Sequence, residues 1–251
     1  MHQPMFYENE GADTLVLFVH GFMGSPNQFE YYANHLRAHN VAVAAVLLPG
    51  HGGSSASFSK HALNSWQEHL QTQLEHYAQR YSNIVLVGHS MGGLLALNAS
   101  TNRANKVSGV FGIATPAKVH LFSPKAIWNK IKLVFYPKHH IIKQAYLQAN
   151  SVQIGIGFLF GCLRPVRGLY QLIQTARNNL AQVTVPVVLV HSRCDETVPH
   201  KSGSILSAGL CNTSCKTILI NNALHAYYPA DEREQILCEI MQLIQTVTGV
   251  V

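Results

Sequence analysis

Charged residues are scarce in this sequence. Asp, Glu, Lys and Arg make up 12% of the 251 residues, whereas apolar residues make up 47%. A disordered chain has the opposite balance, so the composition predicts a folded globular protein of ordinary size. Acidic residues are missing altogether between Glu75 and Asp195, and most of the lysines and arginines lie in that interval. We expect a solvated basic face there; the alternative is a patch that attracts anionic substrates or an anionic membrane surface.

Long apolar runs and clustered cysteines are also missing. The longest apolar stretch, residues 152–163, is too short to span a bilayer, so we expect no transmembrane segment. Residues 1–13 lack the basic start and apolar core of a secretory signal. The five cysteines are odd in number and only Cys211 and Cys215 stand close together, which favours reduced thiols and no bound metal. These absences favour a cytoplasmic protein.

Strand-like and helix-like segments alternate along most of the chain. Near-continuous apolar runs are typical of strands buried on both faces, and they occur at residues 14–19, 41–48, 84–87, 107–114, 185–190 and 216–220. Helical spacing or helix-start signals lie between and after these runs, at residues 27–39, 64–81, 94–100, 201–210 and 231–247. The alternation predicts an α/β fold with a mostly parallel central sheet flanked by helices, in one domain over residues 1–251.

The alternation breaks between residues 116 and 180. This segment is rich in Lys, His and aromatic residues, and its glycine-rich centre has no strand-like period. We predict a mainly helical cap within the same domain, lying over the C-terminal edge of the sheet, where open α/β sheets bind ligands. Its lysines are expected to face water. Its apolar residues are expected to line a substrate channel: Ile127, Phe135, Phe158, Leu159 and Phe160.

A candidate nucleophile lies at the end of the third predicted strand. There, Gly88-His-Ser90-Met-Gly92 matches the pattern G-x-S-x-G between a β-branched strand and a helix of small residues. A strand-to-helix turn this tight strains the backbone at the serine and requires small residues two positions away on each side. Although serine between glycines is often only a turn, this placement favours Ser90 as a nucleophile.

A serine needs a base, and the base needs an orienting acid. In this architecture the base follows the last strand, and His225 occupies that place ahead of the final helix, whereas His191 and His200 stand at ordinary strand and helix ends. Between Ser90 and His225 the only carboxylates are Asp195 and Glu196. We favour Asp195 as the acid and keep Glu196 as the alternative; either residue could instead cap the following helix.

The developing negative charge on a carbonyl oxygen requires backbone donors. One is the N–H of Met91, the residue after the nucleophile, and the other is expected in the loop after the first of these strands, at Phe22. Gly21 would let that loop turn sharply. The alternative for this loop is a glycine-rich turn without a catalytic part.

Four motifs stand in the same order as in a known family: VHGFMGS at 19–25, LPGHG at 48–52, GHSMGG at 88–93 and DETVP at 195–199. The chain resembles the α/β-hydrolases and, more narrowly, the small bacterial carboxylesterases and related monoacylglycerol lipases. The resemblance covers nearly the whole length and is weakest over residues 116–180. It implies hydrolysis of short- to medium-chain carboxylic esters without metal or organic cofactor. It also implies Ser90, Asp195 and His225 as a catalytic triad, with Phe22 and Met91 as oxyanion donors.

Other functions remain open at this point. The same triad serves thioesterases and hydrolases of C–C or amide bonds, and the basic segment would suit an anionic acyl carrier. A non-enzymatic receptor on the same scaffold is disfavoured because the set of catalytic residues is complete. We expect a small-molecule ester as partner and no nucleic acid. A weak peripheral contact with a membrane is the remaining alternative, through Lys125, Trp128, Lys130, Lys132 and Phe135.

Overall fold

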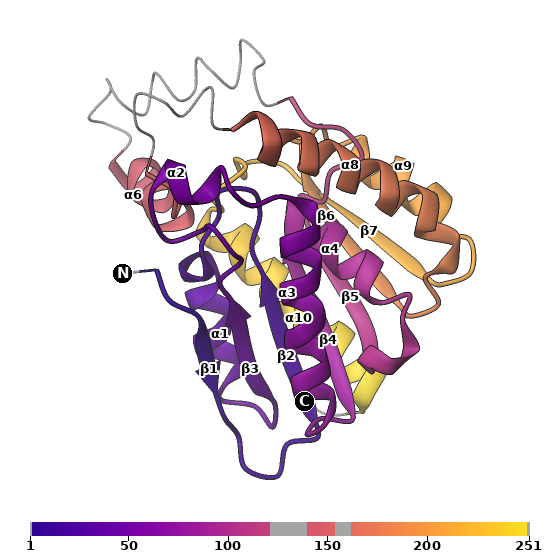
Figure 1. The fold of residues 1–251 in the computed structure, drawn as a ribbon. Coiled ribbons are helices and arrows are strands. Elements are labelled where there is room, and N and C mark those ends of the chain that lie inside the picture. The colour runs from indigo at the N-terminus through magenta and orange to yellow at the C-terminus, as the bar shows by residue number, and fades with distance from the viewer. Residues whose placement is uncertain (1, 121–139, 154–161, 250–251) are drawn as a thin grey trace.

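A single sheet organises the computed structural model, which describes residues 2–120, 140–153 and 162–249 (Figure 1). Within them, seven strands pair in the order β1-β3-β2-β4-β5-β6-β7. All neighbouring strands run parallel except β1 and β3. The strands are β1 (Met5–Tyr7), β2 (Thr14–Val19), β3 (Ala42–Val46), β4 (Asn83–His89), β5 (Val107–Ile113), β6 (Val187–Ser192) and β7 (Cys215–Ile220). The prediction of a mostly parallel sheet flanked by helices is confirmed.

Helices connect and cover these strands. They are η1 (Pro26–Phe29), α1 (Glu30–Leu36), α2 (Ser55–Phe58), α3 (Leu63–Ala78), α4 (Met91–Ala99), η2 (Arg103–Asn105), α6 (His140–Ala149), α8 (Leu163–Asn179), η4 (Leu180–Gln182), α9 (Ser202–Gly209) and α10 (Ala230–Thr248). The helix predicted over residues 27–39 forms as two pieces, a 3-10 turn and then α1. β1 and α2 were not predicted from the sequence, because three edge residues and a single helical turn are too short to show a period.

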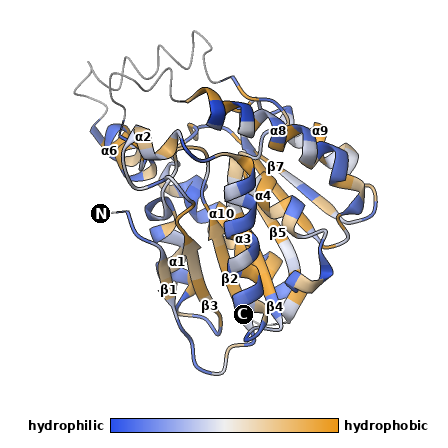
Figure 2. Cartoon of the chain, in the orientation of Figure 1, coloured by the Kyte–Doolittle hydropathy of each residue, from blue (hydrophilic) through white to orange (hydrophobic). Residues whose placement is uncertain are grey.

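Two apolar cores lie on opposite faces of the sheet. Alternate residues of β2 show the division: Leu15 and Leu17 contribute to one core, and Val16 and Phe18 to the other, all at 0% exposure. The first core includes residues of α3, α4 and α8, and the second includes residues of α1 and α10. Figure 2 shows the apolar strands between helices whose outer sides are polar. Burying each such side chain stabilises the fold by about 1.5–3 kcal/mol.

The segment between β5 and β6 departs from strand–helix alternation, and its described parts are helical. Helix α6 packs beside η1, next to the end of β2, and α8 packs across α3 and α4 (Figure 1). Gly168 allows the closest approach, because a side chain there would bring its Cβ 2.9 Å from the backbone nitrogen of Leu63. The cap predicted over residues 116–180 stays a prediction, since residues 121–139 and 154–161 lie outside the described part of the chain.

Four of the histidines that the structure describes are buried: His20, His51, His89 and His191. Burial opposes the charged imidazolium, which lowers the pKa of His51 and of His191 to about 4 and that of His89 to about 3. The pKa of His20 also lies well below its ordinary value, through burial and the nearby His51. All four side chains are therefore neutral in the folded protein at neutral pH.

We expect these histidines to make the free energy of unfolding fall steeply in mild acid. In the unfolded chain they take up protons as the pH falls through about 6.5. In the fold His51, His89 and His191 stay neutral to about pH 4 or below, and the pKa of His20 is also lowered. The unfolded state thus binds more protons in this window, and each histidine adds a slope of up to about 1.4 kcal/mol per pH unit. Urea unfolding measured between about pH 7 and pH 5 gives this slope directly.

Two variants separate buried from exposed histidines in that experiment. His191 has no hydrogen-bond partner for either ring nitrogen among the described residues, so His191→Leu should remove about one proton's worth of slope. His76 is exposed on α3, so His76→Gln should leave the slope unchanged. A stability that stays flat between about pH 7 and pH 5 would contradict the prediction.

Candidate active site

Ser90 occupies a strained turn between β4 and α4. Its backbone has φ 53° and ψ −118°, a left-handed conformation that costs a non-glycine residue energy. Its N–H donates to the carbonyl of Ile113 on β5 at 2.8 Å. Met91 is the first residue of α4, where backbone N–H groups have no partner within the helix. The turn therefore places the serine at a helix N-terminus that no side chain caps.

Glycines on both sides of Ser90 make this turn possible. A Cβ on Gly88 would lie 2.4 Å from the backbone of Gly92, and a Cβ on Gly92 would lie 1.9 Å from the carbonyl oxygen of Val19 on β2. Both distances are far inside van der Waals contact, so the start of α4 touches β4 and β2 backbone to backbone. The pentapeptide is thus a structural requirement of the turn as well as a chemical motif.

The loop after β2 passes directly against Ser90. A Cβ on Gly21 would lie 3.0 Å from the Cβ of Ser90, which is tighter than ordinary van der Waals contact, so glycine favours this close approach of the loop. His20 holds the loop from inside: its Nε2 accepts the N–H of Leu48 at 3.0 Å, and its Nδ1 donates to the carbonyl of Gly21 at 3.0 Å. A neutral imidazole has one donor and one acceptor nitrogen, which matches the lowered pKa of His20.

The side chain and the far end of the same loop are anchored elsewhere. The ring of Phe22 packs edge-on against Phe58 and Trp66, with ring centroids 5.1 and 6.1 Å apart. Beyond it, Ser151 donates its backbone N–H to the carbonyl of Met23 at 2.9 Å and its hydroxyl to the carbonyl of Gly24. The residues that follow α6 thus hold the loop that carries Phe22.

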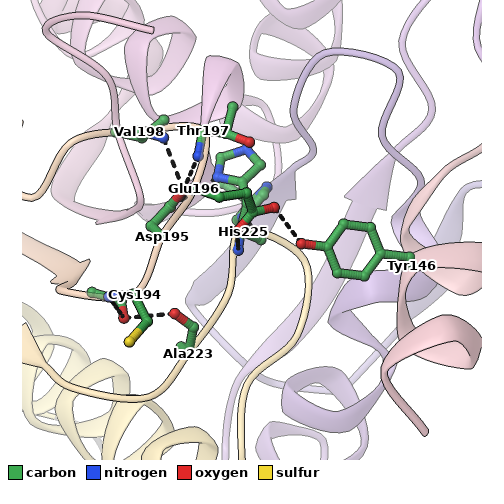
Figure 3. A network of polar contacts seen from close by, with 10 residues as sticks. Tyr146, Cys194, Asp195, Glu196, Thr197, Val198, Ala223 and His225 are labelled. Carbon is green, nitrogen blue, oxygen red and sulfur yellow. Dashed lines mark hydrogen bonds and ion pairs between the residues drawn. The ribbon is translucent and has the colours of Figure 1, made fainter. Parts of the chain in front are cut away.

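The structure brings Asp195 to the ring of His225. Its Oδ2 lies 2.9 Å from Nδ1 of His225, and its Oδ1 accepts the backbone N–H groups of Thr197 and Val198, each at 2.8 Å (Figure 3). Burial alone would raise the pKa of Asp195, but the charge of His225 and these hydrogen bonds outweigh it and lower the pKa below its ordinary value. Asp195 is therefore ionised, and its carboxylate favours a proton on Nδ1 of His225, which leaves Nε2 as the nitrogen that can act as a base.

The backbone of His225 is held on both sides by side chains. Glu196 is only 5% exposed, and its Oε2 accepts the N–H of His225 at 3.1 Å. Its other oxygen accepts the hydroxyl of Tyr146, which comes from α6. On the opposite side, Nε2 of His89 donates to the carbonyl of His225 at 2.8 Å. Glu196 thus hydrogen-bonds to the backbone of His225, whereas Asp195 hydrogen-bonds to its ring.

His89 and Tyr146 were not predicted from the sequence as residues of the site. His89 is the variable second residue of the pentapeptide. The one indication of its place in the site was that it directly precedes Ser90 in the sequence. Tyr146 lies in the segment without strand–helix alternation, where no motif marked it. The predicted channel residues Ile127, Phe135, Phe158, Leu159 and Phe160, and the basic residues Lys125, Lys130 and Lys132 with Trp128, lie outside the described residues.

A cavity of about 450 Å³ adjoins this site. Its walls come from η1 and α1, from one face of α6, and from the loop after His225; they include Gln28, Tyr31, His89, Gln148, Ala226 and Tyr228. Such a volume lies in the range of small-molecule sites. Among the described residues, no group of three or more His, Cys, Asp or Glu side chains could hold a metal ion. No helix in the described part of the chain is long and apolar enough to cross a membrane.

Comparison with known proteins assigns the chain to a family. A sequence model of the alpha/beta hydrolase family matches residues 16–232, which is most of the chain. The chain belongs to this family. Its resemblance to α/β-hydrolases, predicted from four motifs, is thereby confirmed.

Relatives of this hydrolase include esterases and lipases. A carboxylesterase of Bacillus subtilis (strain 168) is 20% identical over 204 residues, which cover 81% of this chain and 80% of the relative. A thermostable monoacylglycerol lipase of Bacillus sp. (strain H-257) is 21% identical over 223 residues, or 89% and 86% of the two chains. A solved structure from work on two metagenome-derived lipolytic enzymes, LipS and LipT, matches with a TM-score of 0.75 at 21% identity and covers 98% of both chains. At this identity the solved structure shows the fold alone.

The backbone contact beneath the serine predicts a severe effect of one methyl group in this hydrolase. Gly92→Ala would press a Cβ into the carbonyl of Val19, and neither backbone can move without disturbing the sheet. Overpacking typically costs about 1–3 kcal/mol where side chains can yield, so we expect at least that loss here. The urea midpoint of unfolding measures it.

Gly53→Ala is the matched control for that variant. Gly53 also lies in a loop of this hydrolase, but a Cβ there would meet no atom within 4 Å. We expect its midpoint to equal that of the unchanged protein. A normal midpoint for Gly92→Ala would mean that α4 does not sit against β2 as described.

Proposed function

We propose that this hydrolase is a serine carboxylesterase that hydrolyses short- to medium-chain carboxylic esters, monoacylglycerols among them, through an acyl-enzyme. The observation that carries the proposal is the pairing of ionised Asp195 with the ring of His225 at 2.9 Å. The loop of His225 is tied to the strained strand-to-helix turn of Ser90 through His89, the residue before that serine. Relatives that include a carboxylesterase and a monoacylglycerol lipase support the choice of esters.

In the proposed reaction, Ser90 Oγ attacks the ester carbonyl while Nε2 of His225 takes up its proton. Asp195 keeps the other ring nitrogen protonated and stabilises the imidazolium that forms. The backbone N–H groups of Met91 and Phe22 are proposed to stabilise the oxyanion. His225 then gives the proton to the departing alcohol. Water, activated by the same histidine, releases the acid from Ser90.

Thioester hydrolysis is a second candidate, favoured by a separate cluster of positive charge. Lys60 and two arginines of α8, Arg164 and Arg167, line a cavity of about 390 Å³ that they share with one carboxylate, Glu68. Among the described residues, none of these three cations forms an ion pair. Such a cluster suits the anionic carrier of an acyl thioester. A neutral ester makes no use of it.

The triad proposal predicts two large losses of activity. Ser90→Ala should lower kcat by about 10⁶-fold, because no other group can form the acyl-enzyme. Asp195→Asn should lower kcat by about 10⁴-fold, because His225 loses both its tautomer and the charge that stabilises its imidazolium. Hydrolysis of a p-nitrophenyl ester measures both.

Covalent labelling tests the nucleophile independently of any substrate. A fluorophosphonate should react with the unchanged protein at Ser90 and should fail to react with Ser90→Ala. Urea unfolding of both variants serves as the control for folding. Labelling at another residue, or full activity in Ser90→Ala, would refute the proposed triad.

A substrate panel distinguishes the two candidates and tests the predicted channel. We expect p-nitrophenyl esters and monoacylglycerol to be cleaved with higher kcat/KM than acyl-CoA. If Phe158 and Phe160 line the acyl channel, Phe158→Ala and Phe160→Ala should shift the preference toward longer chains. Each buried methylene is worth about 0.8 kcal/mol, or about fourfold in kcat/KM.

Two other results of this panel would contradict these expectations. Preference for acyl-CoA, weakened by Arg164→Ala and by added salt, would favour the thioesterase. An unchanged chain-length profile in both phenylalanine variants would remove these residues from the channel. Neither result would affect the labelling of Ser90.

A further inference from the structure

Two adjacent carboxylates meet His225 at different places. Asp195 contacts the ring, whereas Glu196 contacts the backbone N–H of His225 with one oxygen and the hydroxyl of Tyr146 with the other (Figure 3). The triad described above uses Asp195 and assigns nothing to Glu196. A buried carboxylate needs an explanation of its own, because removing it from water is costly unless it is paired or hydrogen-bonded.

The two hydrogen bonds of Glu196 supply that compensation. Hydrogen bonds to an ionised acceptor are roughly twice as strong as those between neutral groups. Burial, followed by the charge of Glu196 and the hydrogen bond to it, raises the pKa of Tyr146, so its hydroxyl stays protonated and donates. Without the carboxylate, the N–H of His225 and the hydroxyl of Tyr146 would both lose their acceptor.

His225 stands on a short closed loop that requires outside support. Leu224 and Tyr227 exchange backbone hydrogen bonds at 2.8 and 3.3 Å, which closes a turn around His225 and Ala226. The N–H and carbonyl of His225 point away from this turn, toward Glu196 and His89 respectively. In a turn this small, the orientation of the two peptide groups of His225 determines the direction of its imidazole. The residues that bond to these groups, Glu196 and His89, therefore determine where the ring lies.

Tyr146 links this anchor to α6. The same stretch of chain continues into Ser151, which bonds to the carbonyls of Met23 and Gly24 in the loop that faces Ser90. Residues 146–151 therefore contact both the histidine side of the site, through Glu196, and the loop on the other side of Ser90.

We propose that Glu196 is a positioning residue for His225. Because Tyr146 belongs to α6 and bonds to Glu196, the position of α6 also affects how His225 is aligned with Ser90. The proposal rests on the proposed triad. Glu196 touches no reacting atom; it holds the N–H of His225 so that the ring stays in line with Ser90. An error of 1 Å in such an alignment can cost about 100-fold in rate. The role requires an acceptor at Glu196 and does not require its charge.

Three variants test the proposal. Glu196→Ala should lower kcat by about 10- to 100-fold and change KM by less than about threefold, since alignment is lost and substrate binding is not. Glu196→Gln should restore most of kcat, because its carbonyl can accept from His225 and its amide can donate to Tyr146. Tyr146→Phe should lower kcat by about three- to tenfold. The double variant Tyr146→Phe/Glu196→Ala should lose less than the product of the two single losses, because the contact with Glu196 is shared, whereas Tyr146 also bonds to the backbone of Ala226.

Matched controls lie next to each position. Cys194→Ser changes an exposed side chain of the same loop, and Leu147→Ala changes a side chain of α6 that is 66% exposed; both should keep full kcat. Should Glu196→Ala fail to fold, Glu196→Gln and Tyr146→Phe decide the question by themselves. Full kcat in Tyr146→Phe, a loss in Glu196→Gln as large as in Glu196→Ala, or a loss confined to KM would each overturn the proposal.

Failure of this proposal differs from failure of the triad. If fluorophosphonate labels Ser90 and Ser90→Ala is inactive, but Glu196→Ala keeps full kcat, only the positioning role is wrong. If Ser90 is neither labelled nor required, the proposed function itself fails. With the triad intact, we expect Glu196→Ala to slow the labelling of Ser90 by a factor similar to its loss in kcat.

Discussion

The candidate active site depends on how closely three stretches of backbone approach one another around Ser90. The loop after β2, the end of β4 and the start of α4 meet where Gly21, Gly88 and Gly92 carry no side chain. This contact forces Ser90 into a left-handed conformation, at a cost of order 1–3 kcal/mol. Hydrogen bonding of β4 to β2 and β5, with apolar cores on both faces, holds the turn in that state. The rigid sheet is what allows the strain to persist.

Around that contact, neutral and charged side chains hold different parts of the loops. His20 and His89 are kept neutral by burial, and each bonds to backbone groups of a loop beside Ser90. Asp195 is ionised and serves the ring of His225. A neutral imidazole offers a donor without the desolvation cost of a charge, so it suits positions deep in the fold. The carboxylate stands where several donors converge and can compensate its burial.

Much of this arrangement could be predicted from the sequence because it depends on local patterns. The predicted strands are near-continuous apolar runs, and Gly88 and Gly92 indicate the tight turn at Ser90. The order of candidate residues along the chain left few choices for acid and base. The rest depends on contacts between distant segments, which leave no local pattern. Tyr146 meets Glu196 across fifty positions of sequence, and His89 meets the carbonyl of His225 across an even longer interval. β1 was missed because it pairs only at the edge.

The span of these contacts has a consequence for how the protein acquires its site. Tertiary contacts join the parts of the candidate site, which lie far apart in the sequence. These parts are the loop at Met23, the turn at Ser90, the residues around Ser151, and the two loops at Glu196 and His225. Closing such long loops is entropically costly and slow. The candidate site is therefore complete only when β6 and β7 have joined the sheet, because Glu196 and His225 lie on the loops that follow these strands.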